Sequence, residues 1–152
     1  MIFLKKQSLA DTKKLAEHLA GFLSAGDLIL LRGNLGAGKT TFTRQLVHAL
    51  SDDPDLIVNS PTFTILQQYT GHGLPFPVYH FDAYRLETIG AADQGFEDYI
   101  GADGLTLVEW PDYMKEILPD QYLEIAFSYD GQDRDVRLTA HGARYEKMLD
   151  RL

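Results

Sequence analysis

Residues 28–40 read LILLRGNLGAGKT, and the architecture of the chain follows from this stretch. Its first four residues are a continuous apolar run, which predicts a strand buried on both faces of a sheet. Its last eight match the pattern G-x-x-x-x-G-K-[ST] in full, and residues 39–50 have the pattern of a helix. A glycine-rich turn between a buried strand and a helix predicts a loop that holds the phosphates of a nucleotide.

The residue types of this loop suit phosphate binding. Glycines let the backbone curl so that consecutive N–H groups point inward, and the following helix adds its positive N-terminal end. Lys39 supplies a full charge for the β- and γ-phosphates, and the Thr40 hydroxyl can ligate Mg²⁺. We therefore expect a nucleotide and Mg²⁺ at Gly33, Asn34, Leu35, Gly36, Ala37, Gly38, Lys39 and Thr40.

Strands and helices alternate through the rest of the chain. Ser8 and Asp11 form a capping-box pattern that opens an amphipathic helix, and residues 86–100 have a helical pattern interrupted by Gly90 and Gly95. Strands are expected at residues 56–58, 62–69, 78–82 and 105–108, a hairpin over 123–138, and a last helix from Gly142 onward. This order predicts an α/β, P-loop NTPase-like domain with a mixed, mostly parallel central sheet flanked by helices and an antiparallel C-terminal hairpin.

Composition limits the class of protein. The 152 residues fit one domain over residues 1–152, and 45% hydrophobic residues are enough to build its core. The 14 basic and 22 acidic residues leave a net charge of −8, which argues against a nucleic-acid binder that works alone. Cysteine is absent, which excludes disulfides and thiolate sites. With no long apolar run, we expect a cytoplasmic protein that does not enter the membrane.

Two acidic residues end apolar strands beyond the loop. Asp82 closes the run from Val78, and Glu109 follows the run over 105–108. Ligands of open α/β sheets gather at the carboxyl ends of strands, so either carboxylate can help to hold Mg²⁺. The alternative for each acid is that it is only a solvated or capping residue at the end of its strand. His80 is a proton-transfer group or, as the better supported reading, a hydrogen-bonded core histidine. Trp110 contacts the site or fills the core.

With these residues in view, the chain resembles the TsaE (YjeE) family of bacterial ATPases, which act in making threonylcarbamoyladenosine in tRNA. Five blocks carry the resemblance in the family's order: GNLGAGKTTF at 33–42, SPTFT at 60–64, HFDAYRL at 80–86, GFEDY at 95–99 and VEWP at 108–111. Asn34 departs from the family, which often has an acid at this position.

The resemblance implies a Mg²⁺-dependent ATPase that binds ATP and ADP, with Lys39, Asp82 and Glu109 as its catalytic residues. Thr40 and Glu109 would hold Mg²⁺, Asp82 would lie by the γ-phosphate, and residues 60–62 would belong to a switch-like segment. Further nucleotide contacts are implied at Leu9, Thr41, Trp110 and Arg134.

Partners also follow from the resemblance. Proteins of this family bind the TsaB–TsaD pair, in which TsaD transfers the threonylcarbamoyl group to tRNA. ATP hydrolysis would reset that pair between rounds, and contact with tRNA would run indirectly through the complex.

Two other functions stay open at this point. A small-molecule P-loop kinase is the alternative, but such kinases carry closely spaced arginines in a lid, and residues 50–80 and 86–133 contain none. The second is an interaction switch for which nucleotide binding, rather than turnover, matters.

Overall fold

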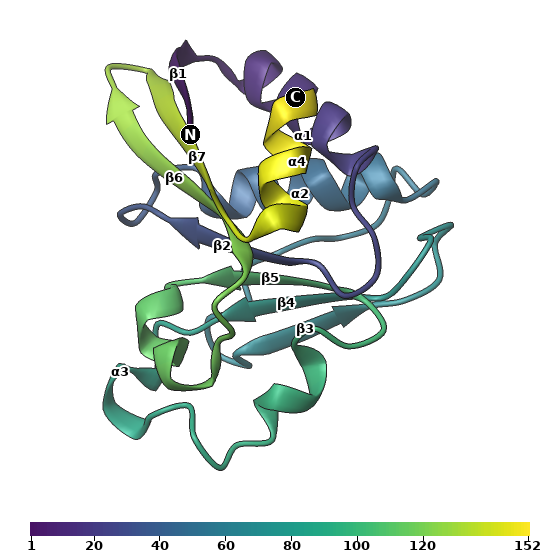
Figure 1. Ribbon diagram of the computed structural model, residues 1–152, viewed down its shortest axis with the longest axis vertical. Coiled ribbons are helices and arrows are strands. Elements are labelled where there is room, and N and C mark those ends of the chain that lie inside the picture. Colours follow the sequence, from purple (N-terminus) through teal and green to yellow (C-terminus); the bar gives the residue numbers. More distant parts are fainter.

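Seven strands form one sheet in the order β1-β7-β6-β2-β5-β4-β3 (Figure 1). The computed structural model describes the backbone of residues 1–152 and all side chains except that of residue 130. The strands are β1 (Ile2–Gln7), β2 (Leu28–Arg32), β3 (Leu66–Tyr69), β4 (Val78–Asp82), β5 (Leu105–Glu109), β6 (Tyr122–Asp130) and β7 (Asp133–His141). The neighbours β6, β2, β5 and β4 are parallel, while β3 and β7 run against them, which confirms the predicted mixed sheet with a C-terminal hairpin.

Helices cover both faces of this sheet. They are α1 (Leu9–Ala20), α2 (Lys39–Leu50), α3 (Leu86–Ile89) and α4 (Ala143–Arg151), with two 3₁₀ helices, η1 (Phe96–Tyr99) and η2 (Pro111–Ile117). Side chains of α1, α2 and α4 share one core with Ile29 and Leu31 of β2, and those of α3 and η2 share the other with Leu28 and Leu30 (Figure 1). Alternate residues of β2 are thus buried on opposite faces, as its apolar run predicts.

The start of α1 confirms the predicted capping box. Ser8 Oγ accepts a hydrogen bond from Asp11 N at 3.1 Å, and the Asp11 carboxylate accepts one from Ser8 N at 2.9 Å. The hydrogen bond that Ser8 N donates to the carboxylate lowers the pKa of Asp11. Two otherwise unpaired backbone donors are satisfied, so the cap directs the chain from β1 into the helix beside the phosphate loop.

The prediction of a strand at residues 56–58 is wrong. Ile57 is 75% exposed, and the carbonyl groups on either side of it are held by α2, where Arg44 Nε donates to Val58 O and His48 Nε2 contacts Leu56 O. Backbone groups that are hydrogen-bonded to side chains are not available for a sheet ladder.

Two further boundaries differ from expectation. The strand expected over 62–69 begins only at Leu66, because residues 61–65 form a turn in which Ile65 N donates to Pro61 O and Ile65 has φ of 70°. Residues 2–7 form an edge strand, β1, which is not among the strands expected from the sequence. The helical stretch over 86–100 is interrupted as expected and contains only α3 and η1. Over the described chain, no helix is both long and apolar enough to cross a membrane.

Candidate nucleotide-binding site

The phosphate loop lies between the end of β2 and the start of α2, at the carboxyl edge of the parallel strands. Gly38, the residue before α2, has φ of 111°, and Gly36 has φ of 76°. L-residues with side chains rarely adopt these angles, so glycine is required for the backbone to curl at these positions. The backbone thus makes the tight turn before the start of α2 that a phosphate-binding loop requires.

Lys39 folds back over this loop. Its Nζ donates to Gly33 O at 2.5 Å and lies 3.6 Å from the centroid of the Trp110 ring. Burial lowers the pKa of Lys39, and the carboxylates of Glu109 and Asp82 oppose that shift. The lysine of the motif is thus held by a backbone carbonyl and an aromatic face at the place where phosphates are expected.

Glu109 is joined to the loop by Thr40. The Thr40 hydroxyl donates to Glu109 Oε1 at 3.1 Å and is 3.4 Å from Oε2, which also lies 2.6 Å from His80 Nε2. Alternation along β5 turns Leu105, Leu107 and Glu109 to the same face as α2. The two residues expected to hold Mg²⁺ are therefore in direct contact.

Asp82 is held by the segment that precedes β3. Its Oδ2 accepts hydrogen bonds from Ser60 Oγ at 2.6 Å and Thr62 Oγ1 at 2.9 Å, and Oδ1 accepts one from Tyr84 N at 3.0 Å. Asp82 is buried, like Glu109. The carboxylate thus connects the end of β4 to residues 60–62, the segment expected to behave as a switch.

Three aromatic rings, those of Trp110, Tyr113 and Tyr84, form a group beside Lys39. Trp110, at φ of 57°, stacks on Tyr113 with ring centroids 6.3 Å apart and meets Tyr84 edge-on at 5.1 Å. A cleft of about 270 Å³ runs between this group and the loop, and Asn34 and Lys39 are among its lining residues. Trp110 therefore lies at the site rather than deep in a core.

The nucleotide contacts implied at Leu9, Thr41 and Arg134 lie apart from this cleft. Together with Gly38 they line a narrow crevice of about 20 Å³ under the β6–β7 hairpin. The buried Nε of Arg134 has no hydrogen-bond partner among the side chains and backbone that the structure describes. Leu35, at the tip of the loop, is 73% exposed and lines neither space.

Sequence reasoning missed Tyr129. Its hydroxyl donates to Gly36 O, and its ring lies 4.6 Å from the Arg134 guanidinium. The hairpin therefore holds the phosphate loop directly. Alternation along β6 places Tyr129 on the same face as the buried Ile125 and Phe127, yet it is 55% exposed, and no local pattern connects it with a loop more than ninety positions earlier.

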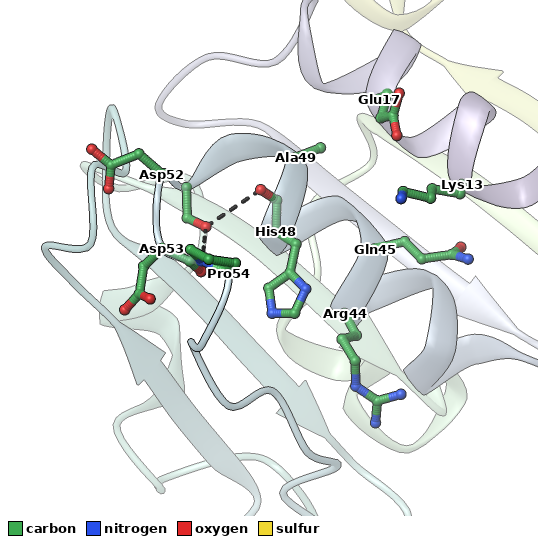
Figure 2. Close-up of a pocket in the computed structure, with 10 residues that line it drawn as sticks. Lys13, Glu17, Arg44, Gln45, His48, Ala49, Asp52, Asp53 and Pro54 are labelled. Atoms are coloured by element: carbon green, nitrogen blue, oxygen red, sulfur yellow. Dashed lines mark hydrogen bonds between the residues drawn. The ribbon is translucent and has the colours of Figure 1, made fainter.

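A larger groove, of about 610 Å³, lies elsewhere, near the C-terminal end of α2. Figure 2 shows that Lys13 of α1 and Arg44, Gln45 and His48 of α2 surround it, with Asp53 across from them. It contains none of the phosphate-loop residues. Size therefore does not identify the nucleotide site, whereas the converging polar groups at the sheet edge do.

Comparison with known proteins agrees with this geometry. Residues 6–137 match the family of the threonylcarbamoyl adenosine biosynthesis protein TsaE. The tRNA threonylcarbamoyladenosine biosynthesis protein TsaE of Bacillus subtilis is 42% identical over 93% of this chain and 87% of its own length. Its counterpart in Aquifex aeolicus is 40% identical over 87% of this chain and 91% of its own.

The fold is shared with a solved structure. The crystal structure of YdiB from Bacillus subtilis superimposes with a TM-score of 0.81 at 33% identity, covering 98% of this chain and 91% of that one. A phosphate loop, a matching sheet and relatives that align over most of their length lead to one conclusion. The chain belongs to the TsaE family of tRNA threonylcarbamoyladenosine biosynthesis proteins and has a P-loop nucleotide-binding fold.

Proposed function

We propose that the protein is a Mg²⁺-dependent ATPase that serves the tRNA threonylcarbamoyladenosine pathway. The observation that supports this most strongly is the contact between Thr40 and Glu109, 3.1 Å apart at a buried sheet edge beside Lys39. A hydroxyl from the loop and a carboxylate from a neighbouring strand are the two protein ligands that P-loop hydrolases use for Mg²⁺.

The residues at this edge fit Mg²⁺. Thr40 and Glu109 offer oxygen atoms only, which Mg²⁺ prefers, and no cluster of three or more acidic or histidine groups forms a metal cage in the part of the chain described. Mg²⁺ in nucleotide sites is commonly held by one or two protein groups together with phosphates and water. When bound, it supplies positive charge to the β- and γ-phosphates.

Each predicted residue then has a role. Lys39 exchanges its contacts with Gly33 O and Trp110 for the β- and γ-phosphates, which carry more charge. Asp82, oriented by Ser60 and Thr62, lies by the γ-phosphate and orients the attacking water. Leu9, Thr41 and Arg134 contact the nucleoside side of the ligand from the crevice beneath the hairpin.

The protein partners that we propose are the TsaB and TsaD homologues, with tRNA contacted through them. The relatives are named for the synthesis of this tRNA modification, while the net charge of −8 disfavours tight tRNA binding by this chain alone. Phe63, beside the Asp82-binding segment, is 84% exposed, and Leu35 at the loop tip is 73% exposed. Apolar side chains exposed beside a nucleotide site suit a protein partner that covers it. ATP hydrolysis would reset the TsaB–TsaD pair between transfers.

Turnover measurements test the proposal. The isolated protein should release phosphate slowly, because the arginines that the structure describes beside the loop have other places: Arg32 pairs with Asp112 and Glu124, and Arg134 lines the crevice beneath the hairpin. An arginine finger contributes about 10³–10⁵ in rate. Adding TsaB and TsaD homologues should accelerate release in the wild type and leave Lys39→Ala slow. Fast release by the pure protein that is unchanged by both partners would contradict the proposal. Transfer of phosphate to a metabolite would favour the kinase alternative instead.

A further inference from the structure

His80 is a fully buried histidine of β4 that contacts the Glu109 carboxylate. Its Nε2 lies 2.6 Å from Glu109 Oε2. An ionised carboxylate only accepts hydrogen bonds, so the imidazole donates from Nε2. The second ring nitrogen, Nδ1, is buried and has no partner within the described structure, which suits an acceptor rather than an N–H group. These contacts place a ring hydrogen on Nε2.

The ring has little freedom to turn away from this contact. β4 lies between β3 and β5, with His80 in register with Gln67 on one side and Leu107 on the other. The Tyr69 ring stacks on the imidazole with centroids 6.4 Å apart and an angle of 27° between planes. Close packing on all sides keeps a buried side chain in one rotamer.

The two oxygens of Glu109 are divided between two donors. Oε2 accepts from His80 at 2.6 Å, and Oε1 accepts from Thr40 at 3.1 Å, while Thr40 is 3.4 Å from Oε2. The imidazole thus determines which oxygen faces the loop. We infer that His80 is a positioning residue whose Nε2–H bond holds the Glu109 carboxylate in the orientation that completes a Mg²⁺ site with Thr40.

This inference rests on the proposed function, because it requires Mg²⁺ at Thr40 and Glu109. Groups that orient a metal ligand by a hydrogen bond typically change metal affinity about 10- to 100-fold when they are replaced. In the proposed site, nucleotide affinity in the absence of Mg²⁺ rests on the loop backbone, Lys39 and Arg134, whereas His80 is hydrogen-bonded to Glu109. Loss of His80 should therefore weaken the contribution of Mg²⁺ and leave metal-free binding unchanged.

Calorimetric titration with a non-hydrolysable ATP analogue, in excess Mg²⁺ and in EDTA, measures that contribution. It is the dissociation constant in EDTA divided by the dissociation constant in Mg²⁺. In His80→Leu the ratio should fall about 10- to 100-fold. His80→Gln, which restores an N–H donor, should recover part of it. His48→Leu is the control, because the partly buried His48 is likewise hydrogen-bonded through Nε2, but to Leu56 O outside the site.

The outcomes separate the inference from the proposed function. No effect of Mg²⁺ on the wild type would contradict the proposed metal site itself. A normal Mg²⁺ effect in the wild type and in folded His80→Leu would overturn the role of His80 alone. Equal losses in His80→Leu and His80→Gln would assign the effect to packing, and would also overturn it.

A spectroscopic measurement on the wild type covers the case in which His80→Leu does not fold. The NMR spectrum should contain a slowly exchanging Nε2–H resonance assigned to His80, which moves when Mg²⁺ is added to the nucleotide complex. A ring with its hydrogen on Nδ1, or a resonance indifferent to Mg²⁺, would overturn the inference.

Discussion

Asp82 and Glu109 are register partners at the ends of the neighbouring parallel strands β4 and β5. Both carboxylates are buried at one sheet edge, yet they bind different groups. Asp82 accepts from the hydroxyls of Ser60 and Thr62, whereas Glu109 accepts from Thr40 and His80. Two acids with adjacent backbones and separate partners are expected to perform separate tasks.

Substitution should separate these tasks. Glu109→Gln should reduce both turnover and the gain in nucleotide affinity that Mg²⁺ provides, because a neutral amide is a poor ligand for a hard cation. Asp82→Asn should keep ADP binding while hydrolysis is lost. Titrations with and without Mg²⁺, together with phosphate release in the presence of the partner proteins, measure both effects. If both variants hydrolyse ATP at the wild-type rate, neither role is correct.

Lys39→Ala should lose most of the affinity for ATP. The Lys39 ammonium group is buried beside the loop, and removal of a desolvated contact between opposite charges costs about 2–5 kcal/mol. Lys14→Ala, on the exposed side of α1, serves as the control and should bind as the wild type does. Calorimetry on folded protein gives the answer, and wild-type affinity in Lys39→Ala would exclude this loop as the nucleotide site.

The fluorescence of Trp110 should report nucleotide binding. Trp110 is the sole tryptophan, and its ring centroid is 3.6 Å from Lys39 Nζ. If Lys39 moves to the phosphates, the indole loses a cation from its face, and its emission should change saturably with ATP and Mg²⁺. The change should be absent in Lys39→Ala. Emission that does not respond to nucleotide in the wild type would contradict the proposed exchange of contacts.

Arg134→Ala should lower nucleotide affinity without changing the contribution of Mg²⁺. Arg134 borders the crevice with Leu9 and Thr41, away from Glu109, and hydrogen bonds of a charged group contribute about 1.5–3 kcal/mol. Arg137, exposed on the same strand, provides the control variant Arg137→Ala. Equal nucleotide affinities of the two variants would show that Arg134 does not contact the nucleotide.

Stability at alkaline pH should depend on Tyr79. Its hydroxyl donates to Asp103 Oδ1 at 2.6 Å, and this bond, together with burial, raises the pKa of Tyr79 from 10.0 to about 12. The folded protein therefore retains a proton that the unfolded chain releases first. This contribution is complete below pH 10 and is lost as the pH rises towards about 12. In urea unfolding experiments, Tyr79→Phe and Asp103→Ala should both flatten that decline, and a slope equal to the wild type would contradict the assignment.

Much of the fold was predictable because its signals are local. The apolar run of β2, the glycine pattern of the loop and the capping box of Ser8 each lie within a few residues, and each produced the expected element. The strand expected over 56–58 failed because Arg44 and His48 of α2 bind its carbonyl groups. Contacts between segments distant in sequence leave no periodic signal.

The sequence alone determined that this chain forms a phosphate loop between a buried strand and a helix, with acids at the ends of two further strands. The tertiary structure decided what those acids touch, because the register of β4 on β5 and of β5 on β2 sets the distances among Asp82, Glu109 and Thr40. It also decided that the hairpin carries Tyr129 and Arg134 onto the loop. The residue types within a few positions of one another specify a helix, strand or turn, whereas the pairing of strands distant in sequence specifies which side chains come into contact.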